Sequence, residues 1–428
     1  MIRSLFQRNL MQARRDPVWG VALLAALLMP WMLAFARAGI EVCGALIGLG
    51  FIWHSTRTRD WAWLRTPFAK VALLSGAWLC VVASPLGEAP LRSFLEGLAW
   101  LRFPLMFLAL RDWLLREASA RTLLAASIAA AVTLVMGDAL YQAASGYSLL
   151  TGHAKLASGR LTGPFEHPKV GMYLGKLLLP AAALLLLSLE RAASRLAVLL
   201  WVALGLCTIL LAGERSALLG ALLVLGLVAG LMALRQDKLR LPVLLAGVGL
   251  LLSFALLYAT NGWVQTRMGQ MAETILHYPK SDYGLLAGAA LDLAREHPWH
   301  GLGIYGFRAL CPWLGYELGD QVLWFRGYHP HNFYLEWLIE AGVPGLLLLL
   351  AQVFTLGREG VQQFRRSIGW RGELAAAATL GLLVQHFFPL IGTQSYFANW
   401  PAMMQWLALG MLFAALGQAK ARADGLHN

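Results

Sequence analysis

The chain has little charge and few cysteines, and both shortages narrow its class. Only 14% of its 428 residues are charged, whereas a soluble domain carries roughly 25%. The four cysteines are scattered and lack the spacing of a metal site. The composition therefore argues against a soluble protein and against a cysteine-bound metal.

Several motifs that carry enzyme chemistry are missing as well. The sequence holds no Asp-X-Asp pair, no close cluster of metal-binding residues and no sign of a serine triad. The glycine-rich stretch Gly301–Gly306 follows no strand of a βαβ unit, so it does not predict a nucleotide site and favours close backbone packing instead. We expect no metal and no cofactor, and we expect cationic side chains to do the electrostatic work.

Long apolar runs are abundant instead. Hydrophobic residues make up 58% of the chain, and the runs approach the ~20 residues that a helix needs to cross a bilayer. The pattern predicts an all-α, polytopic integral membrane protein with a single membrane domain, residues 1–428. About twelve spans are expected, at roughly 18–36, 38–54, 71–84, 97–115, 122–141, 170–189, 196–212, 217–234, 241–259, 333–357, 373–391 and 401–418.

The basic residues predict how these spans are oriented. Most of the 35 lysines and arginines gather at the termini and in alternate loops, for example around Arg57–Lys70, Arg111–Arg121 and Arg358–Arg371. Basic residues concentrate on the cytoplasmic side of membrane proteins. The alternation predicts an even number of spans and two cytoplasmic termini, and it explains the net charge of +12 without a nucleic-acid partner.

Two of the opposite loops are long, and we expect them on the outer, periplasmic side. One covers residues 142–169 and the other covers 260–332, between the ninth and tenth spans. The second loop is rich in aromatic residues, which favour the membrane interface. Its tryptophans and tyrosines are Trp263, Trp299, Trp313, Trp324, Tyr278, Tyr283, Tyr305 and Tyr328.

Basic residues in outer loops run against this bias and are therefore candidates for function. They include Arg160, Lys169 and Arg308, and also Arg215 in the tight turn before the eighth span. Arg215 has a structural and a functional interpretation. In the first it pairs with Glu214 or contacts lipid headgroups; in the second it is an anion clamp. We favour the clamp, because a guanidinium matches phosphate oxygens and the start of a helix favours an anion.

His331 is the strongest catalytic candidate. It stands at the mouth of the tenth span beside Asn332, and Gly342 and Gly345 follow on one helical face. Small residues let membrane helices approach closely, and Pro344 is expected to bend the helix. A lone histidine is more often structural. A histidine fixed at the membrane boundary, however, can accept a proton at neutral pH.

The stretch His331-Asn332, nine residues, Gly342, two residues, Gly345 resembles the signature of the O-antigen ligase and polymerase superfamily. The turn Gly-Glu-Arg215-Ser, the loop from Arg160 to Lys169 and the stretch from Glu296 to Phe307 are also similar to family motifs. The order of the motifs and the layout of the spans match over nearly the whole chain. Lys169 is a departure, since relatives tend to have asparagine after the proline.

This resemblance implies a membrane-embedded, GT-C-like glycosyltransferase. An O-antigen ligase moves a polysaccharide from undecaprenyl diphosphate to the lipid A–core of lipopolysaccharide, without a metal, at the periplasmic face of the bacterial inner membrane. Arg160, Lys169, Arg215 and Arg308 would then bind the pyrophosphate, His331 would act as the base, and inversion at the anomeric carbon is expected. Membrane lipids would surround both substrates.

Three alternatives remain open at this point. An O-antigen polymerase uses the same donor and extends a glycan that is itself carried on undecaprenyl diphosphate. A related protein O-oligosaccharyltransferase transfers the glycan to a protein hydroxyl. A polysaccharide-lipid flippase or transporter, from a different class, also has many spans and basic residues, but the sequence has no visible inverted repeat and few ionisable residues within the spans.

Overall fold

The structure is a computed structural model that describes residues 2–260, 262–310, 316–318, 321–323, 329–389 and 394–424. Three residues singled out in the long outer loop, Trp313, Trp324 and Tyr328, lie outside the described residues.

The described residues form a bundle of long apolar helices, which confirms the predicted all-α, polytopic membrane protein. Ten helical stretches among them are long and apolar enough to cross a membrane. They are Pro17–Phe35 (α2), Arg37–Thr58 (α3), Pro90–Leu114 (α5, α6 and η3), Ala118–Ser145 (α7), Val170–Ser188 (α8), Ala192–Ala212 (α9), Arg215–Arg235 (α10), Asp237–Thr260 (α11), Phe333–Arg366 (α15) and Asn399–Gly417, the apolar part of α17 (Asn399–Asp424).

Two further predicted spans also coincide with helices that are not among the ten. The helix α4 (Pro67–Trp78) continues through one π-helical turn, η2 (Leu79–Ala83), and is apolar but shorter. The helix α16 (Gly369–Phe387) is polar near its start, where Arg371 and Glu373 lie. Each of the twelve predicted spans therefore overlaps a helix of the described residues, and ten of these helical stretches have the length and apolarity of a span.

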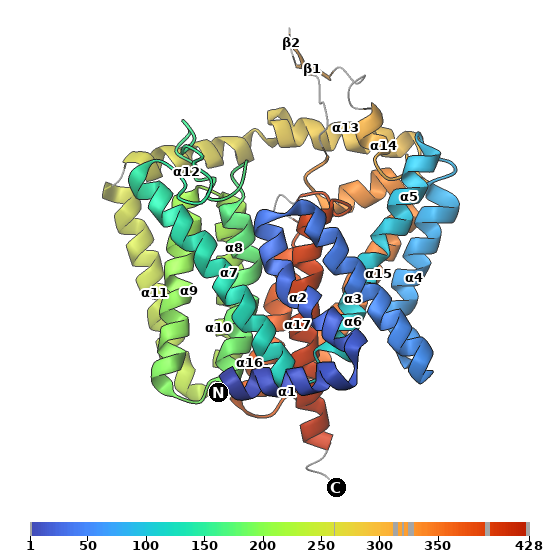
Figure 1. Cartoon of the computed structure of the whole chain (residues 1–428). Coiled ribbons are helices and arrows are strands. Elements are labelled where there is room, and N and C mark those ends of the chain that lie inside the picture. Colours follow the sequence, from blue (N-terminus) through green and yellow to red (C-terminus); the bar gives the residue numbers. More distant parts are fainter. Residues whose placement is uncertain are drawn as a thin grey trace.

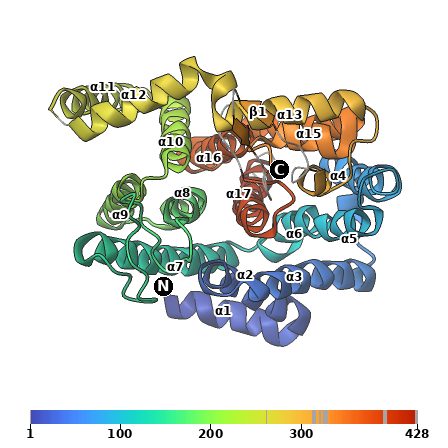
Figure 2. The ribbon, with the colours of Figure 1, turned by 90° about the horizontal axis from the view of Figure 1, so that it is seen from above.

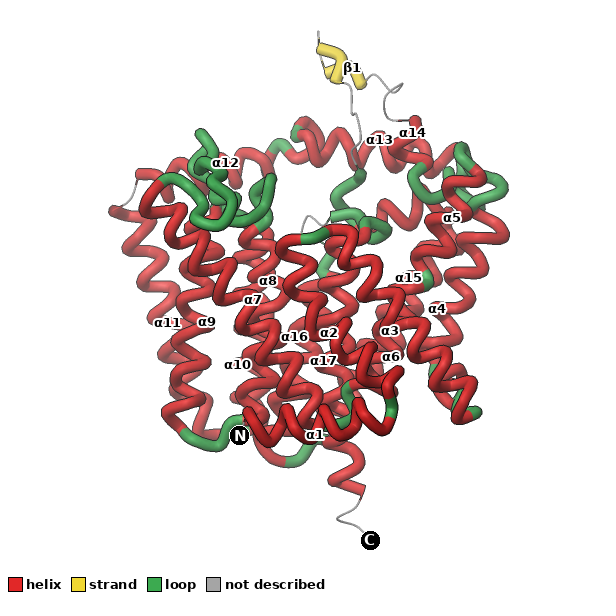
Figure 3. The backbone as a smooth tube through the Cα atoms, in the orientation of Figure 1, coloured by secondary structure: helices red, strands yellow, loops and turns green. Residues whose placement is uncertain are grey.

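The remaining elements lie at the two ends of the bundle (Figures 1, 2 and 3). The helix α1 (Ile2–Arg15) lies along one end, here called the lower end, and α12 (Gly262–Leu276), α13 (Asp282–Glu296) and α14 (Gly306–Leu310) lie across the other, the upper end (Figure 1). Short 3-10 turns, Ala62–Arg65 (η1) and Tyr278–Lys280 (η4), precede α4 and α13. Strands β1 (Tyr316–Leu318) and β2 (Gln321–Leu323) pair antiparallel, with Tyr316 opposite Leu323.

The helix starts follow from local chemistry at the lower end. Asp16 accepts a hydrogen bond from the Trp19 amide at 3.1 Å, and Pro17 opens α2. Thr66 likewise accepts from the Ala69 amide at 3.3 Å, and Pro67 opens α4. An acceptor side chain followed by proline satisfies the first free amides of a helix and fixes where the helix begins.

The helix α17 forms the centre of the bundle, and α11 lies at its edge (Figure 2). In the most apolar stretch of α17, 83% of the residues are buried, whereas none are buried in that of α11. Around α17 the rings of Phe107 and Trp406 pack edge to face at 5.6 Å. An apolar helix with no protein cover is stable when lipid surrounds it, so the outer faces fit a bilayer.

Helix direction alternates, so the loops rich in basic residues share the lower end. The connections at 59–66, 115–117, 189–191 and 367–368 all join helices there, together with α1 and the last turns of α17 (Figure 1). The connection 146–169, the turn at Gly213–Glu214 and the segment before α15 all lie at the upper end. The candidate residues of the outer loops therefore share one end of the molecule, and the assignment of that end to the periplasm stays a prediction.

Candidate active site

His331 lies two residues before Phe333, the first residue of α15, and its neighbour Asn332 fixes where that helix begins. The Asn332 side chain accepts from the amides of Tyr334 at 2.9 Å and Leu335 at 3.2 Å, and donates to the Pro389 carbonyl at 2.8 Å. His331 itself has a left-handed backbone, with φ of 52°. Asparagine is thus both the N-cap of α15 and a link to the residues that follow α16.

Two aromatic side chains border His331. The ring of His329 lies 4.2 Å away, and Tyr283 of α13 meets the His331 ring edge-on at 5.3 Å. The His331 amide donates to Nδ1 of His329 at 3.2 Å. Burial, reinforced by the charges of His331 and Arg308, lowers the pKa of His329 to about 3. His329 is therefore neutral at pH 7, and its Nδ1 helps to orient His331.

The predicted helix after His331 is interrupted at Gly342, which has φ of 71° and ψ of −175°. The loop 298–303 enters this break. The amides of Leu302 and Gly303 donate to the carbonyls of Ile339 and Glu340 at 2.8 and 2.9 Å. Pro344 has no amide to serve the Glu340 carbonyl, so Gly303 supplies the missing donor.

This arrangement corrects part of the prediction for the glycines. Helix–helix approach was expected at both, but a Cβ on Gly342 would lie 2.5 Å from the Trp299 carbonyl oxygen of the incoming loop. At Gly345 a Cβ would meet Ala341 of the same helix first, and the neighbour from another helix is Trp78 of α4, whose indole donates to the Ala341 carbonyl at 2.8 Å. The bend also lies at Gly342 rather than at Pro344, because the positive φ there is open to glycine and strained for other residues.

Two buried carboxylates follow His331 along α15. Glu336 and Glu340 are 1% and 2% exposed. Glu336 accepts from the Tyr396 amide at 2.6 Å, whereas Oε2 of Glu340 has no hydrogen-bond partner within the described part of the chain. Arg308 is a positive charge close enough to act on both. Sequence reasoning passed over this pair, although two acids in an apolar helix are a signal in themselves.

A second group of charges surrounds Glu214, in the turn between α9 and α10. Its carboxylate is 6% exposed and accepts from the amides of Gly171 at 2.8 Å and Met172 at 3.0 Å. Glu214 thus caps the first turn of α8 from another helix. Glu214 forms no ion pair with Arg215 among the described residues, so the structure gives no support to the interpretation of Arg215 as its partner.

Three of the four predicted cations gather around this turn. A Cβ on Gly213 would lie 3.3 Å from Cγ of Arg160, and the charges of Arg160 and Lys169 both act on Glu214. Lys169 Nζ lies 5.0 Å from the centre of the Trp400 ring. Arg215, the first residue of α10, is exposed and has no ion pair among the described residues.

The electrostatics of the group favour an anion. Burial, followed by repulsion from Arg37, lowers the pKa of Lys169. Nε of Arg160 is buried without a partner in the described chain. Glu166, which lies in the same loop as Arg160 and Lys169, pairs with Arg37 at 3.1 Å. A ligand with anionic oxygens would relieve the repulsion and supply the missing acceptor.

Arg308, the fourth predicted cation, lies near the His331 group instead, since its charge acts on His329. It lies in α14 with its guanidinium 4.6 Å from the centre of the Tyr305 ring. The short segment 394–400 touches both groups, because Tyr396 bonds Glu336 and Trp400 packs on Lys169. The histidine and the Glu214 cations therefore lie on two sides of one segment at the upper end.

Glu214 provides a prediction about stability. Burial raises the pKa of Glu214 from 4.5 to about 7, although the two hydrogen bonds from backbone amides and the nearby positive charges act to lower it. The folded state therefore binds the Glu214 proton more tightly than the unfolded state does. The stability that Glu214 contributes should fall as pH rises from about 4.5 to about 7. Glu214→Gln should remove this pH dependence, and Glu214→Ala should cost about 1–3 kcal/mol because two amides lose their acceptor.

The measurement is thermal unfolding in detergent at pH 5 and pH 8. Glu166→Gln is the matched control, because Glu166 is an exposed carboxylate of the same end. An unchanged pH dependence in Glu214→Gln would show that this carboxylate does not titrate as described.

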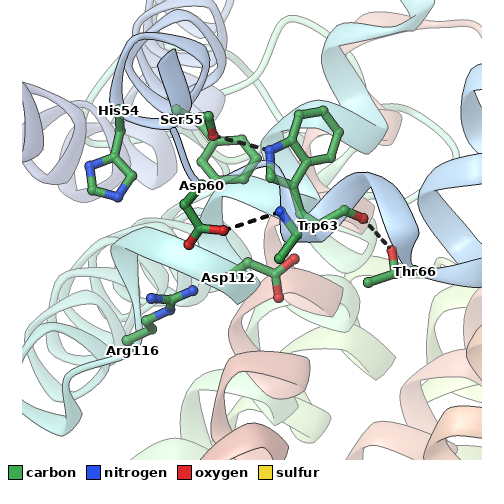
Figure 4. Close-up of a pocket in the computed structure, with 9 residues that line it drawn as sticks. His54, Ser55, Asp60, Trp63, Thr66, Asp112 and Arg116 are labelled. Carbon is green, nitrogen blue, oxygen red and sulfur yellow. Dashed lines mark hydrogen bonds between the residues drawn. The ribbon is translucent and has the colours of Figure 1, made fainter. Parts of the chain in front are cut away.

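A separate cavity of about 180 Å³ lies at the lower end (Figure 4). Its wall carries the Trp63 indole, which donates to the Ser55 hydroxyl at 3.0 Å, and the side chains of His54 and Arg116. None of the predicted site residues lines it. The full lining is Phe51, His54, Ser55, Asp60, Ala62, Trp63, Thr66, Asp112 and Arg116.

The chain resembles a known protein family over part of its length. Residues 198–350 match the family described as O-antigen ligase. The matched region contains Arg215, Arg308, His331 and the Gly342 break, whereas Arg160 and Lys169 precede it. No curated protein matches this chain at a significant level. The match supports the O-antigen ligase and polymerase superfamily, whose members are glycosyltransferase-like enzymes that act on lipid-linked polysaccharides, and the long apolar helices are those of a multi-pass membrane protein.

Proposed function

We propose that the protein is an O-antigen ligase. It would transfer O-antigen polysaccharide from undecaprenyl diphosphate to the lipid A–core of lipopolysaccharide, at the periplasmic face of the inner membrane. The observation that carries this proposal is the pairing of a fixed histidine with a cationic group at one end of a membrane bundle. The family match over residues 198–350 supports it.

In this mechanism His331 acts as the general base. It removes the proton from an acceptor sugar hydroxyl as that oxygen attacks the anomeric carbon of the donor. The new glycosidic bond forms while the bond from the anomeric carbon to the phosphate oxygen breaks, and its electron pair leaves with undecaprenyl diphosphate. The proton on His331 then passes to water. A single displacement of this kind inverts the anomeric configuration.

The cations around Glu214 would stabilise the leaving group. Arg160, Lys169 and Arg215 present positive charge to a diphosphate whose negative charge grows as the bond breaks. The guanidinium of Arg215 offers paired donors for two phosphate oxygens, and the start of α10 adds a favourable helix dipole. The electrostatic work that a metal does in other transferases would thus fall to side chains. Both substrates carry lipid tails and would enter from the surrounding membrane lipids.

The experiment that tests the function uses purified protein in detergent with EDTA. Undecaprenyl-diphosphate-linked O-antigen and lipopolysaccharide that lacks O-antigen are mixed with the enzyme, and the lipopolysaccharide is examined by gel. A ladder of glycan on the lipopolysaccharide is expected. Its loss with EDTA and return with a divalent cation would refute metal independence.

The same reaction separates the alternatives. Lengthening of the undecaprenyl-linked glycan would identify a polymerase, and transfer to a hydroxyl-bearing protein would identify an O-oligosaccharyltransferase. Movement of intact donor across a proteoliposome membrane, with no new glycosidic bond, would replace the ligase with a flippase.

A further inference from the structure

Tyr305 lies between two arginines that come from different parts of the chain. The guanidinium of Arg308 lies 4.6 Å from the centre of the Tyr305 ring, and that of Arg92, in α5, lies 4.5 Å from it. Two guanidinium groups that share one ring repel each other. Holding them there costs free energy unless negative charge offsets the repulsion. Arg92 was not among the predicted site residues, and the family match begins more than a hundred residues after it.

The stacking leaves the hydrogen-bonding edges of both guanidinium groups available. A guanidinium that stacks on an aromatic ring uses its flat face, and its N–H donors point outward in the plane. Neither Arg92 nor Arg308 forms an ion pair with a carboxylate anywhere in the described ranges. Arg92 is exposed and Arg308 is half-buried, so an anion can reach them from the solvent side.

Three carboxylates face this pair. Glu336 and Glu340 are almost fully buried, and Glu336 is bonded to the Tyr396 amide. Glu96 lies one turn after Arg92 and is half-buried, without an ion pair in the described structure. These acids offset the two positive charges from the protein side, and none of the described carboxylates forms an ion pair with either arginine.

The position of the pair is fixed by the backbone around it. The Ile304 amide donates to the Ser93 hydroxyl at 2.7 Å, and Ser93 is bonded to Ser84 at 2.9 Å. Ser93 is the neighbour of Arg92, and Ile304 is the neighbour of Tyr305. These bonds set α5 and the loop 303–306 in one register, so the two guanidinium groups are held ready before any ligand arrives.

We propose that Arg92 and Arg308 form an anion subsite that binds the acceptor, through a phosphate or carboxylate on its sugars. The diphosphate of the donor is also an anion, but the proposed mechanism already assigns it to the cations around Glu214, which are Arg160, Lys169 and Arg215. Arg308 acts on His329 next to His331, so the subsite lies near the proposed base, which must receive a proton from the acceptor hydroxyl. This inference rests on the proposed function, because it names the acceptor side of the same reaction.

The test measures binding without turnover. Purified protein, with no donor present, is titrated with lipopolysaccharide that lacks O-antigen and bears core phosphates, and with the same material after chemical removal of the phosphates. Arg92→Gln and Arg308→Gln should each weaken binding of the phosphorylated probe about tenfold, the scale of one charge-assisted contact. Arg92→Lys should lose less, because the charge remains.

The control is Arg295→Gln, which removes an exposed arginine of α13 that pairs with Asp292. It should leave both affinities unchanged. Equal binding of the two probes by the unaltered protein would overturn the subsite. A raised KM for the donor in Arg92→Gln, with unchanged acceptor binding, would show that the anion belongs to the donor. A protein that binds the acceptor selectively yet transfers nothing would keep the subsite and refute the ligase.

Discussion

Replacing His331 by asparagine is expected to lower the rate of glycan transfer by about 10²- to 10⁴-fold, the range for loss of a general base. Asparagine is the sharpest replacement, because it tolerates the left-handed backbone that His331 adopts and has no basic nitrogen at neutral pH. His331→Ala should abolish transfer as well, with a small extra loss of stability from backbone strain. The readout is the initial rate of ladder formation on lipopolysaccharide.

The comparison variant is His277→Asn, which removes an exposed histidine at the end of α12 that only pairs with Glu273. It should transfer glycan at the normal rate. Both variants should insert into the membrane and bind donor like the original protein. Full activity in His331→Asn, at normal protein levels, would remove this histidine from the mechanism.

The second large effect is expected at Arg215. Replacement by lysine keeps the charge but loses the two parallel N–H donors, so we expect transfer to fall roughly 10- to 100-fold, corresponding to ~1.5–3 kcal/mol for a charged hydrogen bond. The loss should appear mainly in kcat, because the negative charge on the diphosphate grows in the transition state. Initial rates over a range of donor concentrations separate kcat from KM.

Arg235→Lys is a suitable control, since Arg235 ends the same helix at the opposite end of the bundle and donates to the Phe364 carbonyl. Equal turnover by Arg215→Lys and the original enzyme would return Arg215 to a role in contacting lipid headgroups. Equal loss in both variants would point to the stability of α10 rather than to the diphosphate.

The sequence was a good guide to the helices, because span length and apolarity are local properties that a bilayer imposes directly. It also predicted that His331 and Asn332 stand at the mouth of a span, and they lie at the start of α15, where the capping geometry depends on adjacent residues. It did not reveal the break at Gly342 as a docking place for the loop 298–303. That contact joins segments about forty residues apart, and no periodicity encodes it.

The charged groups were harder to foresee, because their partners come from distant elements. Glu214 reads as a natural partner for Arg215, yet its carboxylate binds the start of α8. In the sequence Arg308 is one more basic residue of an outer loop. In the structure it shares the Tyr305 ring with Arg92 and lies near the proposed base. Each case turns on which of several neighbours a side chain reaches, and only tertiary structure decides that.

The eleven residues from Asn332 to Gly342 set a fixed length along the start of α15. Asn332 fixes the upper end of this length through Pro389, and Gly342 fixes the lower end through the loop 298–303. One residue added between them would rotate one end against the other by about 100° and displace it by about 1.5 Å, so the two anchors would no longer engage together. The interval is therefore a requirement on length, whatever side chains fill it, and insertions in this chain will be tolerated outside it far more readily than within.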